Sequence, residues 1–130
     1  MENTILQLEH DIASFINKDN GATVHFEYHV ESFASVTVSA FTINPNNKEV
    51  FLLKTVRTQS KELALEEILE YVKNQKGLNS FTVTWAKRPG VPVQTSYFYC
   101  HDVTDVVKKF FAKKELSDYV VYEIKLNPIA

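Results

Sequence analysis

The stretch from Thr95 to Phe111, TSYFYCHDVTDVVKKFF, changes its hydrophobic period in the middle. Its first part, Thr95 to His101, is rich in aromatic residues, which is typical of a β-strand. Asp102 is a residue type that caps helix N-termini. Counted from it, the offsets +4, +5, +8 and +9 hold the apolar residues Val106, Val107, Phe110 and Phe111, which is a helical spacing. The stretch therefore predicts a strand that leads directly into a helix.

The same order of elements occurs once earlier in the chain. A β-branched and apolar run over residues 50–57 precedes a helical run over 61–75. Counted from Ser60, the same four offsets hold Ala64, Leu65, Ile68 and Leu69. Each helix is followed by an alternating run, over residues 81–87 and 119–126. The sequence thus predicts two successive strand–helix–strand units.

This order is typical of a ferredoxin-like, or split βαβ, arrangement with both helices on one face of the sheet. We therefore predict an α+β fold with a ferredoxin-like βαββαβ core over about residues 49–126. An N-terminal helix and two additional antiparallel strands, over 24–30 and 33–43, precede this core. The apolar stripe of that helix is Ile5, Leu8, Ile12, Phe15 and Ile16. A cystatin-like curved sheet around a helix is the alternative that uses the same elements.

Length and composition favour one folded domain that spans residues 1–130. The net charge of −2 excludes a global positive field that would attract nucleic acid or acidic lipid. Cys100 is the only cysteine, which excludes an internal disulfide and a Cys-rich zinc site. No apolar stretch approaches the roughly 20 residues that a membrane span needs, and no targeting segment is visible. We therefore expect a cytoplasmic protein without membrane contact.

Polar side chains occupy the alternate positions of several predicted strands. A solvated strand face carries Lys, Glu and Arg more often than the hydroxyl, imidazole and phenol groups present here. The strands also place Ser35, Thr37 and Ser39 on this polar side. We take as candidate ligand-binding residues His25, Glu27, His29, Thr82, Thr84, Lys87, Arg88, Tyr97, Tyr99 and His101. Lys87 and Arg88 enter this set because they precede Pro89-Gly90 in a basic loop suited to a carboxylate or a phosphate.

The strand VHFEYHV, from Val24 to Val30, raises the question of a metal site. Same-face neighbours on a strand lie roughly 6.5–7 Å apart at Cα. Two of the donors His25, Glu27 and His29 can therefore converge on one ion, whereas all three converge with difficulty. A catalytic zinc needs three protein ligands. We predict no bound metal and no cofactor.

Two further patterns have structural interpretations. Cys100 and His101 are neighbours in a strand and should point to opposite faces, which argues against a catalytic dyad. Cys100 is then a small buried hydrophobe. Tyr97 and Tyr99 resemble the aromatic stacking platform of RNA-recognition domains. Their strand lacks the leading Lys/Arg-Gly pair, and its outward face has little positive charge, so nucleic acid is not the favoured partner.

Together these observations predict a small binding or assembly module rather than an enzyme. Its contact surfaces are the polar sheet face and the basic loop, and its ligand is a small anionic or polar molecule. Homodimerisation through a sheet face or an edge strand is a further expectation, since an uncovered edge can pair with another strand. The alternative is an enzyme or metal-binding protein that uses His25, Glu27, His29 and His101. A second alternative is an RNA or single-stranded DNA binder.

Overall fold

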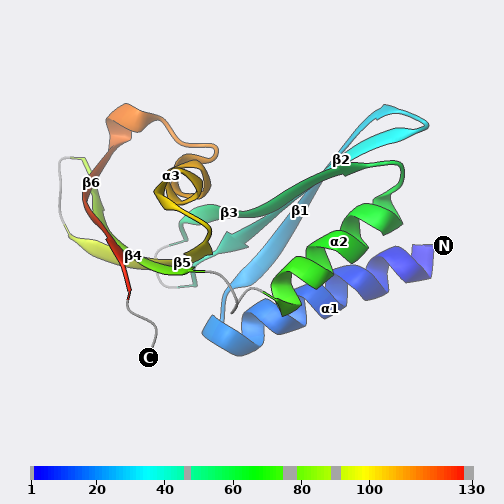
Figure 1. Ribbon diagram of the computed structural model, residues 1–130, viewed down its shortest axis with the longest axis horizontal. Helices are drawn as coiled ribbons and strands as arrows, with labels where there is room; N and C mark the ends of the chain where they lie inside the picture. Colours follow the sequence, from blue (N-terminus) through cyan, green and yellow to red (C-terminus); the bar gives the residue numbers. More distant parts are fainter. Residues whose placement is uncertain (1, 46–47, 75–78, 89–91, 128–130) are drawn as a thin grey trace. The chain divides into compact units, whose positions relative to one another are not determined.

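A computed structural model describes residues 2–45, 48–74, 79–88 and 92–127. The chain divides into two compact units, Met1–Asn74 and Gln75–Ala130. Each unit contains one three-stranded antiparallel sheet and at least one helix (Figure 1). The predicted α+β class is confirmed, and the prediction of a single domain stays a prediction. Within the described ranges, no helix is both long and apolar enough to cross a membrane.

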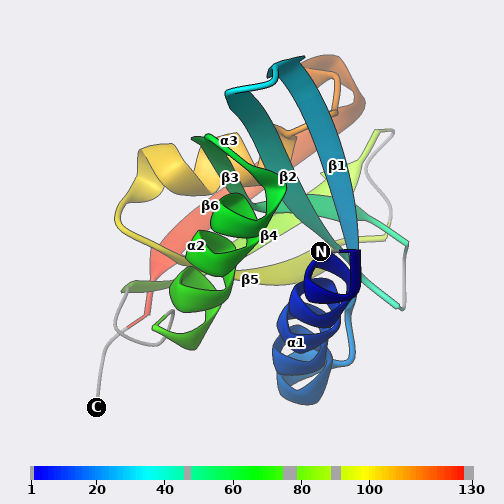
Figure 2. The same ribbon diagram turned by 90° about the vertical axis from the view of Figure 1, so that its right-hand side faces the viewer.

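The first unit is an antiparallel meander with two helices on one face of its sheet. Its elements are α1 (Glu2–Asn20), β1 (Thr23–Ser32), β2 (Ser35–Ile43), β3 (Val50–Thr58) and α2 (Lys61–Lys73), and its sheet order is β1-β2-β3. The two helices lie side by side (Figures 1 and 2). Gly21 ends α1: its φ of 75° lies in the left-handed region, and its N–H donates to the Asn17 carbonyl at 2.8 Å.

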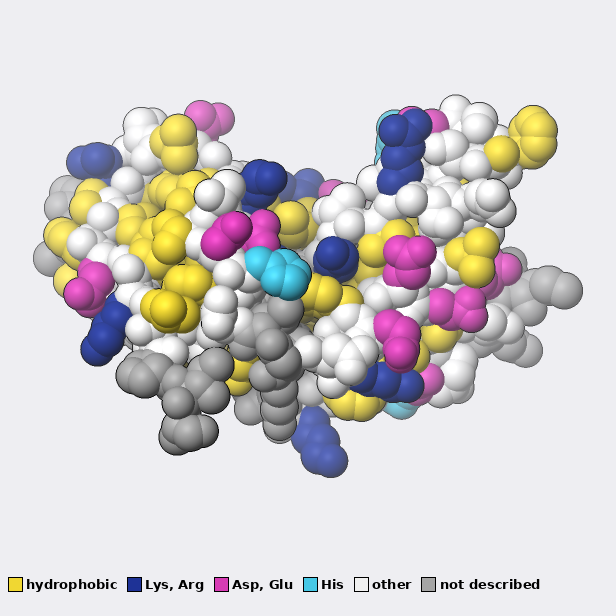
Figure 3. Space-filling view, viewed as in Figure 1, with side chains coloured by type: hydrophobic (Ala, Val, Ile, Leu, Met, Phe, Trp, Pro, Cys, Tyr) yellow, Lys and Arg dark blue, Asp and Glu magenta, His cyan; other side chains and the backbone are white. Residues whose placement is uncertain are grey.

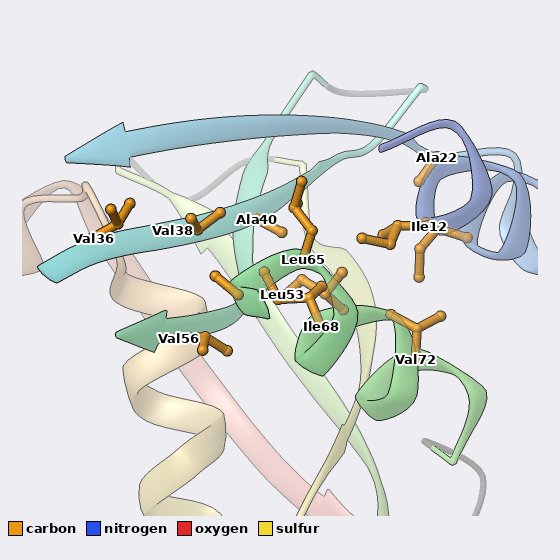
Figure 4. Packing of buried hydrophobic residues seen from close by; sticks show 12 residues of the cluster. Ile12, Ala22, Val36, Val38, Ala40, Leu53, Val56, Leu65, Ile68 and Val72 are labelled. Atoms are coloured by element: carbon orange, nitrogen blue, oxygen red, sulfur yellow. The ribbon is translucent and has the colours of Figure 1, made fainter. Parts of the chain in front are cut away.

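One apolar core joins the helices of the first unit to its sheet (Figure 4). Alternate residues of β2 face this core, because side chains alternate between the faces of a strand. They meet Leu65 and Ile68 of α2, both fully buried, and Ile12 of α1. The core cluster consists of Ile12, Ile16, Ala22, Val36, Val38, Ala40, Leu53, Val56, Ala64, Leu65, Ile68 and Val72. The predicted apolar stripe of α1 is wrong at Phe15, which is 45% exposed because α1 turns this position away from the sheet.

Tyr28 links β1 to α1 at the border of this core. Its ring packs against the core cluster, and its phenol O–H donates to the Glu9 carboxylate. Burial raises the pKa of the Tyr28 phenol well above its ordinary value of 10.0, and the hydrogen bond and the negative charge of Glu9 raise it further. The phenol therefore stays protonated through the neutral range and keeps donating to Glu9.

We expect Tyr28→Phe to lower the free energy of unfolding by about 1 kcal/mol, a low value for a hydrogen bond to a charged group because both partners are partly exposed. A raised pKa in the folded state means that this stabilisation is fully present below pH 10 and is lost as the pH rises above it. Urea unfolding of both proteins between pH 7 and pH 11 measures the difference. A difference that stays constant above pH 10 would contradict the assignment.

The second unit contains β4 (Asn79–Lys87), β5 (Gln94–Cys100), α3 (Val103–Phe111), the short 3-10 helix η2 (Leu116–Asp118) and β6 (Tyr119–Leu126). Its sheet order is β5-β4-β6, and β4 is antiparallel to both neighbours. The strands β5 and β6 therefore run in the same direction on either side of β4, with α3 in the connection between them. This is one split βαβ unit of the kind that the stretch from Thr95 predicts.

The core of the second unit is aromatic. Phe110 of α3 lies 5.3 Å from Trp85, 6.5 Å from Phe98 and 5.8 Å from Tyr119, measured between ring centroids. These three contacts are edge-on, which is a favoured geometry for aromatic pairs. The buried indole N–H of Trp85 donates to the Ser96 hydroxyl at 2.9 Å, so the polar atom that enters the core has a partner.

The ferredoxin-like arrangement is not confirmed. In that arrangement, the strand over residues 50–57 would belong to the same sheet as the later strands. In the described residues it pairs with β2 and forms the edge of the first sheet. The physical reason is the helix α2, whose apolar side packs against α1 and β2 of its own unit. The first of the two predicted strand–helix–strand units is thus divided between the two sheets.

Candidate functional site

The ten candidate ligand-binding residues fall into two groups, one in each unit. His25, Glu27 and His29 lie on β1 of the first sheet, and the other seven belong to the second unit. Strand alternation predicts that these residues lie on the polar sides of their strands, and the structure distributes those sides over two sheets.

The polar face of the first sheet lies opposite the helices. Cross-strand register joins His29 to Thr37 and Thr37 to Arg57 in one row. The next row contains Glu27, Ser39 and Thr55, in which the hydroxyls of Ser39 and Thr55 are hydrogen-bonded at 3.0 Å. The sequence-based placement of Ser35, Thr37 and Ser39 on a polar side is therefore confirmed.

A hydrogen-bonded network closes one end of this first face. The Glu31 carboxylate accepts from the Arg57 guanidinium at 2.8 Å and from the Thr37 hydroxyl at 3.0 Å. Arg57 also donates through Nε to the Ser35 hydroxyl at 3.2 Å. Sequence reasoning missed Glu31 and Arg57 as partners, because they come from two strands that are not neighbours in the sheet. The opposite charges of Glu31 and Arg57 are therefore paired with each other at this end.

His25 of β1 forms a pair with the Glu27 carboxylate. His25 Nε2 lies 3.6 Å from a Glu27 carboxylate oxygen, and both side chains are substantially exposed. The part of the chain that the structure describes contains no group of three or more His, Cys, Asp or Glu side chains able to hold a metal ion. His101 belongs to the other unit. The arrangement therefore offers one imidazole and one carboxylate side by side on an open surface.

The second polar face is more open, and we call it the second-sheet face. It is the side of β5-β4-β6 opposite Phe81 and Val83, which face the core. Register and alternation place nine polar or aromatic residues on it in three rows across the sheet. The rows are Tyr99–Ser80–Asn127, Tyr97–Thr82–Lys125 and Thr95–Thr84–Glu123.

One end of the second-sheet face is fixed by side-chain hydrogen bonds. Thr82 donates through its hydroxyl to the Asn127 side-chain oxygen at 2.9 Å. The Asn127 amide group in turn donates to the Ser80 hydroxyl at 3.2 Å. Tyr97, in the adjoining position of the middle row, has 70% of its surface exposed. Ser80, Thr82 and Asn127 therefore form a hydrogen-bonded polar floor beside the open ring of Tyr97.

The remaining candidate residues lie at the two ends of the second sheet. Lys87 and Arg88 are exposed at the end of β4, where the Arg88 backbone N–H donates to the Asp118 carbonyl at 3.0 Å. The loop residues 89–91 that follow them lie outside the described residues. His101 is exposed at the end of β5, where its carbonyl accepts from the Asn79 side chain at 3.0 Å. These three residues border the second-sheet face but do not belong to its rows.

Cys100 is buried, with 1% of its surface exposed, as the alternation of its strand predicts. Burial raises the pKa of the Cys100 thiol, although the positive charge of Lys109 opposes the shift. A raised pKa keeps the thiol protonated at neutral pH, and the thiol is a poor nucleophile in that form. Asp102 caps α3 by accepting from the Asp105 backbone N–H at 2.9 Å. In the Cys-His-Asp sequence, Cys100 thus packs in the core and Asp102 caps the helix.

The second-sheet face also contains residues that were not among the candidates: Ser80, Thr95, Glu123, Lys125 and Asn127. The alternation of Glu123 and Lys125 against Ile124 and Leu126 was a usable signal for two of them. Comparison of the chain with protein families, with curated proteins and with solved structures finds no match. The geometry of the two faces is what bears on function.

Proposed function

We propose that this protein is a binding module whose recognition surface is the second-sheet face. The observation that carries the proposal is the exposure of Tyr97, 70% of whose surface is open beside a polar floor. An exposed ring surrounded by hydroxyls supplies apolar contact area together with hydrogen-bonding groups. The floor residues are already held in place by hydrogen bonds, and this reduces the entropy cost of ordering side chains when a ligand binds.

The middle row indicates the chemistry of the ligand. It places the Tyr97 ring, the Thr82 hydroxyl and the Lys125 ammonium on three adjacent strands. Adjacent strands lie about 4.8 Å apart, so the ring and the ammonium are separated by about 10 Å. A planar group that stacks on Tyr97 and an anionic group that reaches Lys125 fit this distance. The proposed ligand is a small molecule with a planar ring and a negative charge.

The charge distribution along the chain supports an anionic ligand for this unit. Residues 1–74 contain six Lys or Arg and eleven Asp or Glu, a net charge of −5. Residues 75–130 contain eight Lys or Arg and five Asp or Glu, a net charge of +3. The whole-chain charge of −2 therefore conceals a positively charged second unit. An anionic ligand is attracted to the unit that contains the second-sheet face.

A titration monitored by NMR tests the proposal, with adenosine monophosphate as a probe that combines a planar ring and an anion. We expect shifts of the amide signals of β4, β5 and β6 around the middle row. Tyr97→Ser should weaken binding about fivefold or more, because stacking on an aromatic ring contributes about 1–3 kcal/mol. Phe33→Ser is the matched control, since Phe33 is 99% exposed on the first unit, and it should leave the affinity unchanged.

Two further probes distinguish a small-molecule site from a phosphate site and from a nucleic-acid site. Inorganic phosphate alone should bind more weakly than adenosine monophosphate, since it lacks the ring. A single-stranded dT10 that binds the same face much more tightly than the mononucleotide would favour the nucleic-acid alternative. Amide shifts confined to the first unit, or an affinity that Tyr97→Ser leaves unchanged, would overturn the proposal.

A further inference from the structure

The strand β6 is an edge strand with an open side. In the described part of the second sheet, β6 pairs with β4 alone. Its apolar side chains are unusually open, with Tyr122 56% and Leu126 55% exposed. Figure 3 shows hydrophobic side chains gathered on the surface over α3 and β6. An exposed apolar edge strand is a template for pairing with another strand.

The other edge strand of this sheet, β5, is less suited to pairing. The Lys109 ammonium of α3 donates to the carbonyl of Tyr99 in β5 at 3.5 Å. The connection to α3 also begins directly after Cys100, the last residue of β5. A second strand along β5 would compete with this side chain. The open edge of β6 is therefore the better surface for strand addition.

The backbone groups of β6 that point outward can be identified from one hydrogen bond. The Asn127 N–H donates to the Ser80 carbonyl at 2.8 Å, which makes these residues a hydrogen-bonded pair in the register of β6 with β4. Hydrogen-bonded and non-hydrogen-bonded pairs alternate along an antiparallel ladder. The N–H and C=O groups of Ile124 and Leu126 therefore point away from β4, toward the open edge.

The sequence YEIKL, from Tyr122 to Leu126, is complementary to itself when it is reversed. In an antiparallel pair of two copies centred on Ile124, each Glu123 lies opposite Lys125 of the other copy. Tyr122 then lies opposite Leu126, and Ile124 lies opposite itself. The two Ile124 residues form a hydrogen-bonded pair, because their backbone groups point outward. The Glu–Lys pairs are then non-hydrogen-bonded pairs, in which side chains lie closest.

The charges also disfavour the neighbouring registers. A pair centred on Glu123 places two glutamates opposite each other, and a pair centred on Lys125 places two lysines opposite each other. Like charges directly opposite on adjacent strands are destabilising, and opposite charges are stabilising. Of these three registers, the two charges therefore select the one centred on Ile124.

From these observations we infer that two copies of this chain associate by antiparallel pairing of β6 with β6, centred on Ile124. The two three-stranded sheets of the second units then form one continuous six-stranded sheet. The two-fold axis is perpendicular to this sheet, so the second-sheet faces of both copies lie on the same side. The inference concerns the edge of the sheet and does not depend on a ligand for its face.

Charge-reversal variants test the inference when they are measured singly, combined in one chain and mixed with each other. Analytical ultracentrifugation over a range of concentrations should show a dimer for the unaltered chain. Glu123→Lys and Lys125→Glu should each raise the dimer Kd about tenfold or more, because each creates two like-charge pairs. The double variant Glu123→Lys/Lys125→Glu should restore dimerisation. An equimolar mixture of the two single variants should form a heterodimer, since Glu and Lys are again opposed.

Circular dichroism of each variant shows whether the monomer still folds, and rescue in the mixture excludes simple misfolding. Glu66→Lys on the exposed side of α2 is the control charge reversal and should leave the dimer Kd unchanged. A monomer at the highest measurable concentration would overturn the inference. So would a dimer whose Kd is the same in both single variants, since that dimer uses another surface.

Discussion

Phe110→Ala is expected to lower the free energy of unfolding of the second unit by about 3–5 kcal/mol. Phe110 has 1% of its surface exposed and is the only side chain of α3 whose ring meets β4, β5 and the start of β6 in the described structure. It also contacts the next residue, Phe111, at 4.8 Å between centroids. Truncation removes all these contacts at once and leaves a cavity that rigid rings cannot fill.

Trp85 is the only tryptophan and lies 5.3 Å from Phe110, so its fluorescence reports directly on this core. Urea unfolding followed by this signal should give a clearly lower midpoint for the variant. Phe110→Leu, which retains most of the apolar volume but not the ring, should be affected less. Phe33→Ala, at a position that is 99% exposed, should change the unfolding free energy by no more than about 0.5 kcal/mol. An unchanged midpoint for Phe110→Ala would show that α3 does not hold this sheet together.

The importance of Phe110 could be predicted from the sequence because it depends on local spacing. Asp102 predicts the start of α3, and its side chain does cap the helix. Four residues after the buried Val106, Phe110 then falls on the same helix face. Val107 was predicted on that face too, yet it is 39% exposed, because with 3.6 residues per turn it lies about 100° around the helix axis from the buried Val106.

The pairing of strands could not be predicted in the same way. The pattern of residues 50–57 identifies a strand, but the pattern is equally compatible with either sheet. The choice depends on the partner strand, and here β3 pairs with β2 while its residues Leu53 and Val56 join the core cluster that α2 completes. The pairing with β2 leaves no local trace in the sequence of β3. The prediction of a βαββαβ core assigned α1 and the first two strands a minor role, whereas they form the core of the first unit.

For the candidate site too, the local pattern indicates the face of a strand but not its partner strands. Alternation within a strand placed Thr82, Thr84 and Tyr97 on one face, and cross-strand register confirms that they share it. It placed His25 and His29 on a polar face as well, but on a sheet that belongs to the other unit. Alternation determines which side of a strand a residue occupies, and it does not determine which strands meet.

Leu65→Ala is the second change with a large expected effect, about 2–5 kcal/mol on the stability of the first unit. Leu65 is fully buried at the centre of the cluster that joins α1, α2 and the first sheet (Figure 4). Trp85 belongs to the second unit, so the first unit needs its own probe. Hydrogen exchange of the amides of β2, the central strand, measures the loss, because exchange from a central strand requires opening of the core.

Leu63→Ala provides a matched control for Leu65→Ala on the same helix, because it deletes the same atoms from a side chain that is 45% exposed. The Leu63 backbone N–H donates to the N-cap Ser60, and that bond is retained when the side chain is shortened. The control variant should therefore exchange nearly as slowly as the unaltered chain, whereas Leu65→Ala should accelerate exchange at Val38 and Ala40 by at least about thirtyfold, the equivalent of 2 kcal/mol. Equal acceleration by both variants would mean that α2 contributes helix stability and not core packing, and the assignment of α2 to the first sheet would fail with it.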